Sequence, residues 1–285
     1  MTRRSKINIL IICVVCLLTC VLSGFTTTQA SEAEAPHDRV SLFMNGIKVA
    51  DGLSIEGSTY VSLRSFTEVI GVDADIAWDE KTSTATVTSE GLELSVISGS
   101  NYISANGRCF YLPLGVQNHD GSVIVPIRDL AKLFGASVEW DTESASVSII
   151  ADELAPIAAA DVTYNKDDLY WLARIINAEA GNQPLDGKIA VGNVVQNRVA
   201  DPTCPDTIYG VIFDNKFGVQ FSVTTNGAIY AEPNAESLVA AKLCLEGCNV
   251  VGNSIYFVNP DIGVSSWFAK TRAFVATIGE HDFYA

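Results

Sequence analysis

The sequence has few histidines and few positive charges. Among its 285 residues there are three His, and 18 Lys and Arg stand against 33 Asp and Glu, so the formal net charge is −15. A chain this acidic is poorly suited to bind nucleic acid or an anionic membrane surface, because like charges repel. His281 is the sole histidine after His119 and no HExxH motif occurs, so the residues of a zinc amidase or a Cys/His peptidase are missing. We therefore expect neither a metal nor another cofactor.

Cysteine is scarce beyond the first 30 residues. Four cysteines allow three pairings, and the sequence does not choose among them. A structural disulfide and buried thiols are both compatible with the pattern, whereas a metal site lacks a nearby histidine. The seven cysteines are Cys13, Cys16 and Cys20 near the start, and Cys109, Cys204, Cys244 and Cys248 in the remainder.

The N-terminus has the pattern of a targeting segment. Three basic residues precede an apolar run, Ile9–Leu22, which is too short for a comfortable membrane span. Thr28-Gln29-Ala30 then resembles a small-x-small cleavage site. We expect residues 1–30 to be a signal peptide and the protein to be secreted or associated with the cell wall. An uncleaved anchor and a lipid on Cys20 are the alternatives, and either would tie the chain to a membrane.

Residues 40–150 contain an internal repeat. Each copy is expected to form a hairpin, a short helix and a second hairpin, with helices at Leu63–Ile70 and Ile127–Phe134 that end at a glycine. Asn45-Gly46 and Asn106-Gly107 are expected to be hairpin turns. The shared residues are Gly57, Val61, Arg64, Gly71, Trp78 and Asp79 in the first copy and Gly121, Val125, Arg128, Gly135, Trp140 and Asp141 in the second.

This repeat resembles the copper amine oxidase N-terminal-like domain of exported bacterial proteins. The resemblance rests on V-x-[LI]-R, a short helix, a glycine and a later Trp-Asp, and it covers most of residues 40–150. It implies a stalk that is structural or contacts the wall. His37 and His119 are too few to hold copper. We expect Arg64 and Arg128 to be structural ion-pair partners.

A linker and a helix are predicted to follow the repeat. Residues 151–164 are rich in alanine and lack a periodic apolar face, which is typical of a linker. A helix is expected from about Lys166 to Ala180-Gly181, with Asn165 as its N-cap. Helical periodicity places Glu179 in its last turn, at the edge of the apolar stripe.

Glu179 is predicted to have a raised pKa. Burial and the negative end of the helix dipole both disfavour a carboxylate there. A carboxylic acid that stays protonated near neutral pH is what the leaving oxygen of a glycoside requires from its general acid. The alternative is a structural glutamate bonded to the backbone or to Arg174 or Arg198, and on position alone structural pairing is the default.

A second helix, Gly187–Val199, is expected to follow, with Asp186 as its N-cap. Asn197 and Arg198 are expected to cap its end, the alternative being a place in a cleft. The stretch INAEAGNQPLDGKIAVGNVVQNRV, residues 176–199, resembles the signature of the SleB-type cell-wall hydrolases, which include the spore-cortex-lytic enzymes. GVQFS, IYFVNP and IGEHDFYA match the family later in the chain and in the same order.

This resemblance implies an α+β fold, with a lysozyme-like catalytic domain over residues 165–285 preceded by a duplicated ββαββ stalk domain. It also implies that Glu179 is the catalytic acid and base. Gln183 stands where the family often has Glu, which puts any role of that position in doubt. Tyr256, Trp267 and Tyr284 are expected either to stack on sugars or to fill the core, and His281 either to orient substrate or to be structural. The substrate-binding candidates are Gln220, Ser222, Tyr256, Asn259, His281 and Tyr284.

The predicted activity is cleavage of peptidoglycan. Family members that act on spore cortex are lytic transglycosylases, which cleave between N-acetylmuramic acid and N-acetylglucosamine and leave a 1,6-anhydro end, a reaction that one carboxylate can serve. A hydrolysing muramidase would need a second carboxylate about 5–9.5 Å away, and a non-catalytic wall-binding protein is the further alternative. The expected partner is wall or cortex peptidoglycan. Candidates for a second carboxylate are Asp186, Asp214, Glu232, Asp261 and Asp282, and none stands out.

Overall fold

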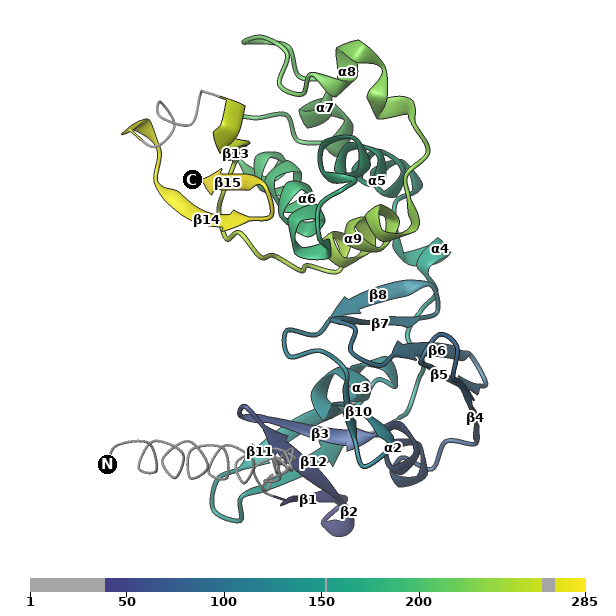
Figure 1. Ribbon diagram of the computed structural model, residues 1–285. Helices are drawn as coiled ribbons and strands as arrows, with labels where there is room; N and C mark the ends of the chain where they lie inside the picture. The colour runs from purple at the N-terminus through teal and green to yellow at the C-terminus, as the bar shows by residue number, and fades with distance from the viewer. Residues whose placement is uncertain (1–38, 152, 263–269) are drawn as a thin grey trace, which may run out of the picture. The chain divides into compact units, whose positions relative to one another are not determined.

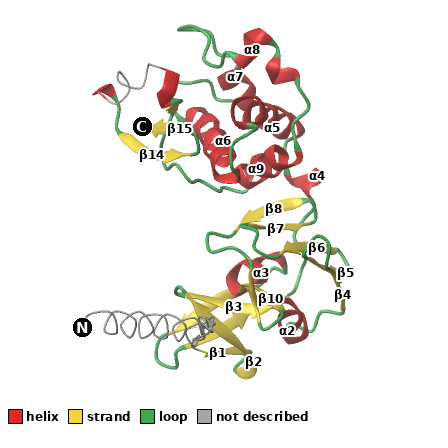
Figure 2. Ribbon diagram, viewed as in Figure 1, coloured by secondary structure: helices red, strands yellow, loops and turns green. Residues whose placement is uncertain are grey.

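The computed structural model describes residues 39–151, 153–262 and 270–285 (Figure 1). From residue 38 onward the chain forms one compact unit. Strands dominate up to residue 150 and helices dominate the rest, so the chain is a mixed α+β protein (Figure 2). Within the described ranges, no helix has the length and apolar character needed to cross a membrane. The predicted signal segment, Cys13, Cys16, Cys20, His37 and Trp267 lie outside the described residues.

A seven-stranded sheet has the order β11-β12-β1-β2-β3-β10-β9. β12 pairs in parallel with β1, and β3 pairs antiparallel with β10. In the second pair Val61 lies opposite Val125. These valines are equivalent positions of the repeat, so a local two-fold axis passes between them. The strands are β1 (Arg39–Met44), β2 (Ile47–Ile55), β3 (Ser58–Ser62), β9 (Gln117–His119), β10 (Ser122–Pro126), β11 (Ser137–Asp141) and β12 (Ser146–Ile150).

A five-stranded antiparallel sheet follows the order of the chain. The hairpin β7–β8 turns at Asn106-Gly107, and both residues have positive φ, 50° and 77°. Asn45-Gly46 turns between β1 and β2 in the same way, so both predicted hairpin turns are confirmed. The strands are β4 (Ala74–Asp79), β5 (Thr84–Ser89), β6 (Leu92–Ile97), β7 (Tyr102–Ala105) and β8 (Arg108–Tyr111).

Two short helices pack on these sheets, α2 (Leu63–Val69) and α3 (Ile127–Leu133). Each is followed by a left-handed glycine, Gly71 at φ 68° and Gly135 at φ 71°, as the sequence predicts. The prediction that Arg64 and Arg128 form structural ion pairs is wrong. Both side chains are exposed, and neither takes part in a hydrogen bond or ion pair within the described part of the chain.

The helical half is built around α5 (Lys166–Ala180), which begins where it was predicted. The Asn165 side chain accepts hydrogen bonds from the amides of Asp167 and Asp168 and so caps its first turn. Buried side chains of α5, α6 and α9 form the core of this half. The other elements are α6 (Leu185–Ala200), α7 (Ile208–Ile212), α8 (Val223–Asn226), the 3₁₀ turn η1 (Ala228–Tyr230), α9 (Ala235–Leu245) and the 3₁₀ turn η2 (Pro260–Ile262).

A small antiparallel sheet completes this half, in the order β13-β15-β14. It consists of β13 (Tyr256–Val258), β14 (Phe274–Ile278) and β15 (His281–Tyr284). The sheet packs on α6 through Phe283, which is fully buried. The predicted strand at IYFVNP is therefore confirmed, although Ile255 and Phe257, expected in the core, are only half-buried.

Residues 151–164 make hydrogen bonds both to the β7–β8 turn and to the residue after α9, so they do not form a free spacer. They include the short helix α4 (Ala160–Thr163). The Asn106 amide donates to the Ile157 carbonyl over 2.8 Å, and the Tyr164 hydroxyl donates to Glu246 over 2.7 Å. Arg108 of β8 also donates two hydrogen bonds to Glu246, of 2.6 and 2.7 Å. These bonds use backbone and side-chain partners distant in sequence, so the composition of the segment gave no sign of them.

The four described cysteines are free thiols, so the disulfide alternative is not realised. Cys109 and Cys244 are buried in the core of the helical half. Burial raises the pKa of both thiols, and it raises the pKa of Cys248 to about 11. Nothing about Cys109, Cys244 or Cys248 therefore indicates a reactive thiolate at neutral pH.

Candidate functional site

Glu179 lies in the last turn of α5, as predicted. Leu172, Ile176 and Ala180 on the same helix are fully buried, and they hold this helix against α6 and α9. Burial raises the pKa of the Glu179 carboxyl, and desolvation is the sole cause. The carboxyl is therefore biased toward its protonated form by its surroundings alone.

Glu179 makes no hydrogen bond or ion pair within the described part of the chain. The two arginines that were its candidate partners are engaged elsewhere. Arg174 pairs with Glu232 over 2.6 Å and lies over the Tyr170 ring. Arg198 donates from Nε to the Ile255 carbonyl over 2.7 Å. Neither arginine is therefore the ion-pair partner that the structural alternative for Glu179 required.

The turn after Glu179 is fastened to the start of α9. Asn177 accepts a hydrogen bond of 3.0 Å from the Asn234 amide, and Asn234 donates from its side chain to the Gly181 carbonyl over 3.1 Å. Asn234 also caps α9 by accepting from the Ser237 amide. The signature residue Asn177 therefore fixes the backbone on either side of Glu179.

Gln183 is a buried connector between the α5–α6 turn and the β14–β15 turn. Its side-chain amide donates to the Glu280 carboxylate over 3.0 Å and accepts from the Glu280 backbone amide over 2.9 Å. The side chain is only 5% exposed. A glutamate here would face the Glu280 carboxylate, so the amide at this position suits the partner that this chain has.

The polar face of α6 holds the segment from residue 248 to 255. Asn193 donates to the Cys248 carbonyl and accepts from the Val250 amide, and Asn197 donates to the carbonyls of Gly252 and Ser254. The expectation that Asn197 and Arg198 cap their own helix is therefore wrong. Both bind a segment distant in sequence, which leads directly into β13.

The expectation that Asp186 is a helix N-cap is also wrong. Pro184 occupies that position, and Asp186 lies in the first turn of α6, where it accepts a 3.2 Å hydrogen bond from Tyr111. Glu232 is paired with Arg174, Asp214 accepts from the Lys216 amide, and Asp282 accepts from the Thr277 hydroxyl. Of the five candidates for a second carboxylate, these four therefore have other partners.

Two of the predicted substrate-binding residues meet in one small cavity. Gln220 and Tyr256 line a space of about 70 Å³ together with Arg198, whose Nη1 is buried without a partner. Arg198 also lies 5.7 Å from the Tyr256 ring. Burial lowers the pKa of this guanidinium. Arg198 was not among the predicted binding residues, although its place at the end of the signature was a usable signal.

The other predicted substrate-binding residues are not brought together. Ser222 is exposed at the start of α8, and Asn259 accepts from the Asp261 amide within a turn. Tyr284 is 2% exposed and packs on Phe274, which corresponds to the core alternative. His281 is buried, its ring lies edge-on to Phe257, and burial lowers its pKa. Its Nδ1 is buried without a hydrogen-bond partner among the described residues, so the hydrogen bond expected of a structural imidazole is not found there.

An aromatic group that the sequence analysis missed surrounds Trp171 of α5. Tyr209 and Tyr230 are 53% and 61% exposed, and their rings lie 5.3 and 6.3 Å from that of Trp171. Trp171 precedes Glu179 on the same helix by about 12 Å of axial rise. Exposed rings at this distance are candidate stacking surfaces for sugars. The sequence did contain a signal for this group, because these aromatic residues lie outside the periodically spaced apolar positions.

Comparison with known proteins connects these features to a family. Residues 182–284 match the Cell Wall Hydrolase model, and residues 43–149 match the Copper amine oxidase N-terminal domain model. The chain carries a cell-wall hydrolase domain. Glu179 lies just before the matched segment of this hydrolase domain.

Several curated proteins and solved structures are similar to this domain. The spore cortex-lytic enzymes of Oceanobacillus iheyensis and Bacillus subtilis are 34% and 30% identical over 120 residues, or 42% of this chain and 42% and 38% of those proteins. The chain thus spans less than half the length of these relatives. The catalytic domain of the germination-specific lytic transglycosylase SleB of Bacillus anthracis is 33% identical, with a TM-score of 0.39, over 43% of this chain and 97% of that one.

Proposed function

We propose that the hydrolase domain is a lytic transglycosylase that cleaves peptidoglycan between N-acetylmuramic acid and N-acetylglucosamine. The observation that carries the proposal is Glu179, a half-buried carboxyl with a raised pKa and no ion-pair or hydrogen-bond partner within the described residues. Such a group can hold a proton near neutral pH and release it to substrate. The printed name of the similar Bacillus anthracis domain supports the same reaction.

The proposed mechanism uses Glu179 twice. As an acid it donates its proton to the oxygen of the glycosidic bond, and the C1–O bond breaks with that oxygen leaving on N-acetylglucosamine as a hydroxyl. As a base the resulting carboxylate then takes the proton of the C6 hydroxyl of N-acetylmuramic acid while O6 bonds to C1. Glu179 is thereby reprotonated and the product is a 1,6-anhydro sugar. One carboxyl suffices, in agreement with the other partners of Asp186, Asp214, Glu232 and Asp282.

We further propose a lysozyme-like arrangement for the hydrolase domain and a duplicated ββαββ stalk for residues 40–150. A helix that ends in the acid and lies near a small antiparallel sheet supports the first. The shared element order of the copies supports the second, since β3-α2-β4-β5 corresponds to β10-α3-β11-β12. The predicted leader, the acidic charge and the named relatives support action outside the cell, at the wall or cortex.

The experiment that tests the activity compares wild-type protein with Glu179→Gln on purified peptidoglycan. Glu179→Gln keeps the size of the side chain and removes the proton donor, so soluble sugar products should disappear. Asp206→Asn is the matched control, because Asp206 is exposed and has no partner within the described residues. Mass spectrometry of the wild-type products should show anhydro-muramyl ends. Reducing ends would replace this proposal with a muramidase, and release by the folded Glu179→Gln protein would overturn the role of Glu179.

A further inference from the structure

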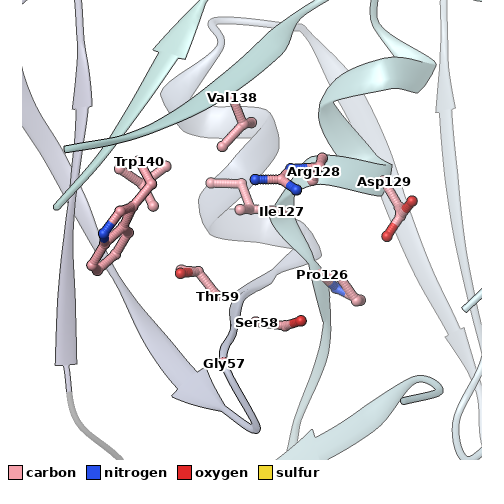
Figure 3. Close-up of a pocket in the computed structure, with 10 residues that line it drawn as sticks. Gly57, Ser58, Thr59, Pro126, Ile127, Arg128, Asp129, Val138 and Trp140 are labelled. Atoms are coloured by element: carbon pink, nitrogen blue, oxygen red, sulfur yellow. The ribbon is translucent and has the colours of Figure 1, made fainter. Parts of the chain in front are cut away.

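The repeat module contains two cavities, and they have corresponding linings. One has a volume of about 230 Å³ and the other about 370 Å³. In the first, Arg128 and Trp140 border the space together with Ser58, as Figure 3 shows. In the second, the equivalent residues Arg64 and Trp78 border the space together with Ser122. Neither cavity belongs to the site around Glu179.

Each cavity is made jointly by both copies of the repeat. Gly57, Ser58 and Thr59 of the first copy enter the cavity of Arg128 and Trp140, which belong to the second copy. Gly121, Ser122 and Val123 of the second copy enter the other cavity in return. This exchange follows from the antiparallel pairing of β3 with β10 about the Val61–Val125 pair.

Four of the six positions shared by the copies have a clear structural task. Gly57 and Gly121 take positive φ in turns, Gly71 and Gly135 do so after α2 and α3, and Val61 and Val125 are buried. Asp79 and Asp141 each accept hydrogen bonds from the amide two residues on and the hydroxyl three residues on. Folding alone therefore explains why both copies have these four pairs of residues.

The arginine and the tryptophan have no such task. Trp78 and Trp140 are each 48% exposed, which is costly for an indole in water. Arg64 and Arg128 are exposed and make no hydrogen bond, ion pair or cation–π contact within the described residues. A guanidinium without an ion-pair partner is unexpected in a chain with 33 acidic residues. Asp129 lies near enough to Arg128 to feel its charge, but its ion pair is with Lys132. The two residue types left without a fold role are those that border both cavities.

Their chemistry fits an acidic sugar. An indole face is a large apolar platform on which the less polar face of a pyranose ring can lie. A guanidinium binds a carboxylate through two parallel hydrogen bonds. Ser58 and Ser122 add a hydroxyl at the mouth of each cavity. The volumes lie near the lower end of the roughly 300–1,000 Å³ of ligand pockets, which suits one or two sugar rings.

We propose that these two cavities bind peptide-free stretches of the glycan strands of peptidoglycan, with a sugar ring on Trp78 or Trp140 and the lactyl carboxylate of muramic acid on Arg64 or Arg128. The polymer is taken from the proposed function. The cavity of Trp78 is the roomier, because Ala85 and Ser65 occupy the positions of Val147 and Asp129 in the other. It therefore accepts the larger fragment. Asp129 points away from Trp140 (Figure 3), so its charge does not face the sugar platform.

The test observes each tryptophan separately in the full chain. The sequence has four tryptophans, so 5-fluorotryptophan labelling gives four ¹⁹F resonances, which Trp→Phe variants assign. The Glu179→Gln background prevents cleavage of the probe. Peptide-free glycan chains, in which each muramic lactyl group ends in a free carboxylate, should shift the resonances of Trp78 and Trp140. Unshifted resonances for both at saturating glycan would overturn the proposal.

Variants then separate the two contacts. Arg64→Gln should weaken glycan binding at the Trp78 site about tenfold and leave the Trp140 site unchanged, and Arg128→Gln should do the converse. Trp78→Tyr should keep most of the binding that Trp78→Ala loses, because a ring remains; both variants lack the Trp78 reporter, so titration calorimetry with the same glycan chains measures this pair. Lys81→Gln and Ile47→Ala remove an exposed charge and an exposed apolar side chain from the same module and should change nothing.

Two further outcomes complete the test. Stem peptide without sugar should leave the resonances in place, and a response to that peptide alone would make these peptide sites and refute the glycan assignment. Failure of the proposed function is distinguishable, because wild-type protein would then release no sugar although the ¹⁹F shifts persist. Conversely, if sugar is released but the resonances do not shift, the proposed function stands and the proposal that the cavities bind glycan is rejected.

Discussion

Gln183 and Glu280 are joined by two hydrogen bonds, one to the carboxylate and one from the backbone amide of Glu280. This pair of a buried amide and an exposed carboxylate connects the turn that follows Glu179 with the turn that leads into β15. A neutral donor at position 183 is complementary to an anion at position 280. The difference from the family signature therefore has a local physical explanation, and it does not concern the acid itself.

Gln183→Glu should destabilise the protein at neutral pH. The change removes the donor and places a buried carboxylate at position 183 beside the exposed carboxylate of Glu280, with an expected loss of about 1–3 kcal/mol in the free energy of unfolding. Burial and repulsion raise the folded-state pKa of the introduced carboxyl, so the loss should shrink as the pH falls and that carboxyl takes up a proton. Denaturant titrations at pH 7 and pH 4 measure it. Adding Glu280→Gln should restore stability, and no recovery in that double variant would contradict the pairing.

The activity should depend on a protonated Glu179. Its pKa is raised by burial, so kcat/KM should fall as the pH rises through that value, because the acid form is lost. Glu179→Gln should reduce turnover at all pH values, by about 10²–10⁴-fold for the loss of a general acid. Initial rates of sugar release between pH 4 and 9 provide the measurement. An alkaline limb that survives in Asp206→Asn and vanishes with Glu179→Gln would identify the group.

The Glu179→Gln substitution should stabilise the fold at neutral pH. A carboxyl whose folded-state pKa lies above its unfolded value lowers stability once the pH exceeds the unfolded value, about 4.3 for Glu. Glu179→Gln removes this penalty, so its free energy of unfolding should exceed that of wild type at pH 7. The two proteins should converge toward pH 3. Equal stability at pH 7 would mean that burial exerts no net cost on this carboxylate.

The ion pair of Lys188 and Glu236 should respond unequally to loss of either partner. Lys188 is 2% exposed and also donates to the Gln183 carbonyl, whereas the Glu236 side chain is 53% exposed. Glu236→Gln leaves a buried ammonium without its counter-charge and should cost about 3 kcal/mol. Lys188→Met leaves a carboxylate that water can solvate and should cost less. Chemical denaturation of both variants decides the order, and a larger loss for Lys188→Met would contradict it.

The contact of Arg108 with Glu246 should control the stability of the joint between the β7–β8 hairpin and α9. Glu246 accepts two hydrogen bonds from Arg108 and one from Tyr164. Glu246→Gln should weaken all three and increase amide hydrogen exchange in residues 151–164 and in β8. Catalytic rates on soluble fragments should remain unchanged. Hydrogen exchange followed by mass spectrometry makes the comparison, with Lys166→Gln, an exposed charge at the start of α5, as control.

Local features of the structure were accessible from sequence because they depend on neighbouring residues. The cap at Asn165, the end of α5 near Gly181 and the glycines after α2 and α3 all follow from short-range rules. The pKa direction of Glu179 was predicted too, and burial is its cause. The apolar periodicity of the helix was enough to predict the partial burial of Glu179.

Features that join distant segments were not accessible. The partner of Gln183 is 97 residues away, and the register that places Val61 opposite Val125 depends on the pairing of strands from different copies. Asn197 was predicted to cap a helix because its partners, the carbonyls of Gly252 and Ser254, could not be seen in the linear chain. Long-range pairing has no periodic signal of its own.

The two-fold relation at Val61 and Val125 also has a directional consequence. A glycan strand has distinct ends, and a two-fold axis that exchanges two sites reverses the direction of a ligand that lies perpendicular to it. A strand that crosses the cavity of Trp78 in one sense would cross the cavity of Trp140 in the opposite sense. A module that bound glycan in both cavities would therefore be suited to bridge two antiparallel strands and poorly suited to slide along a single one.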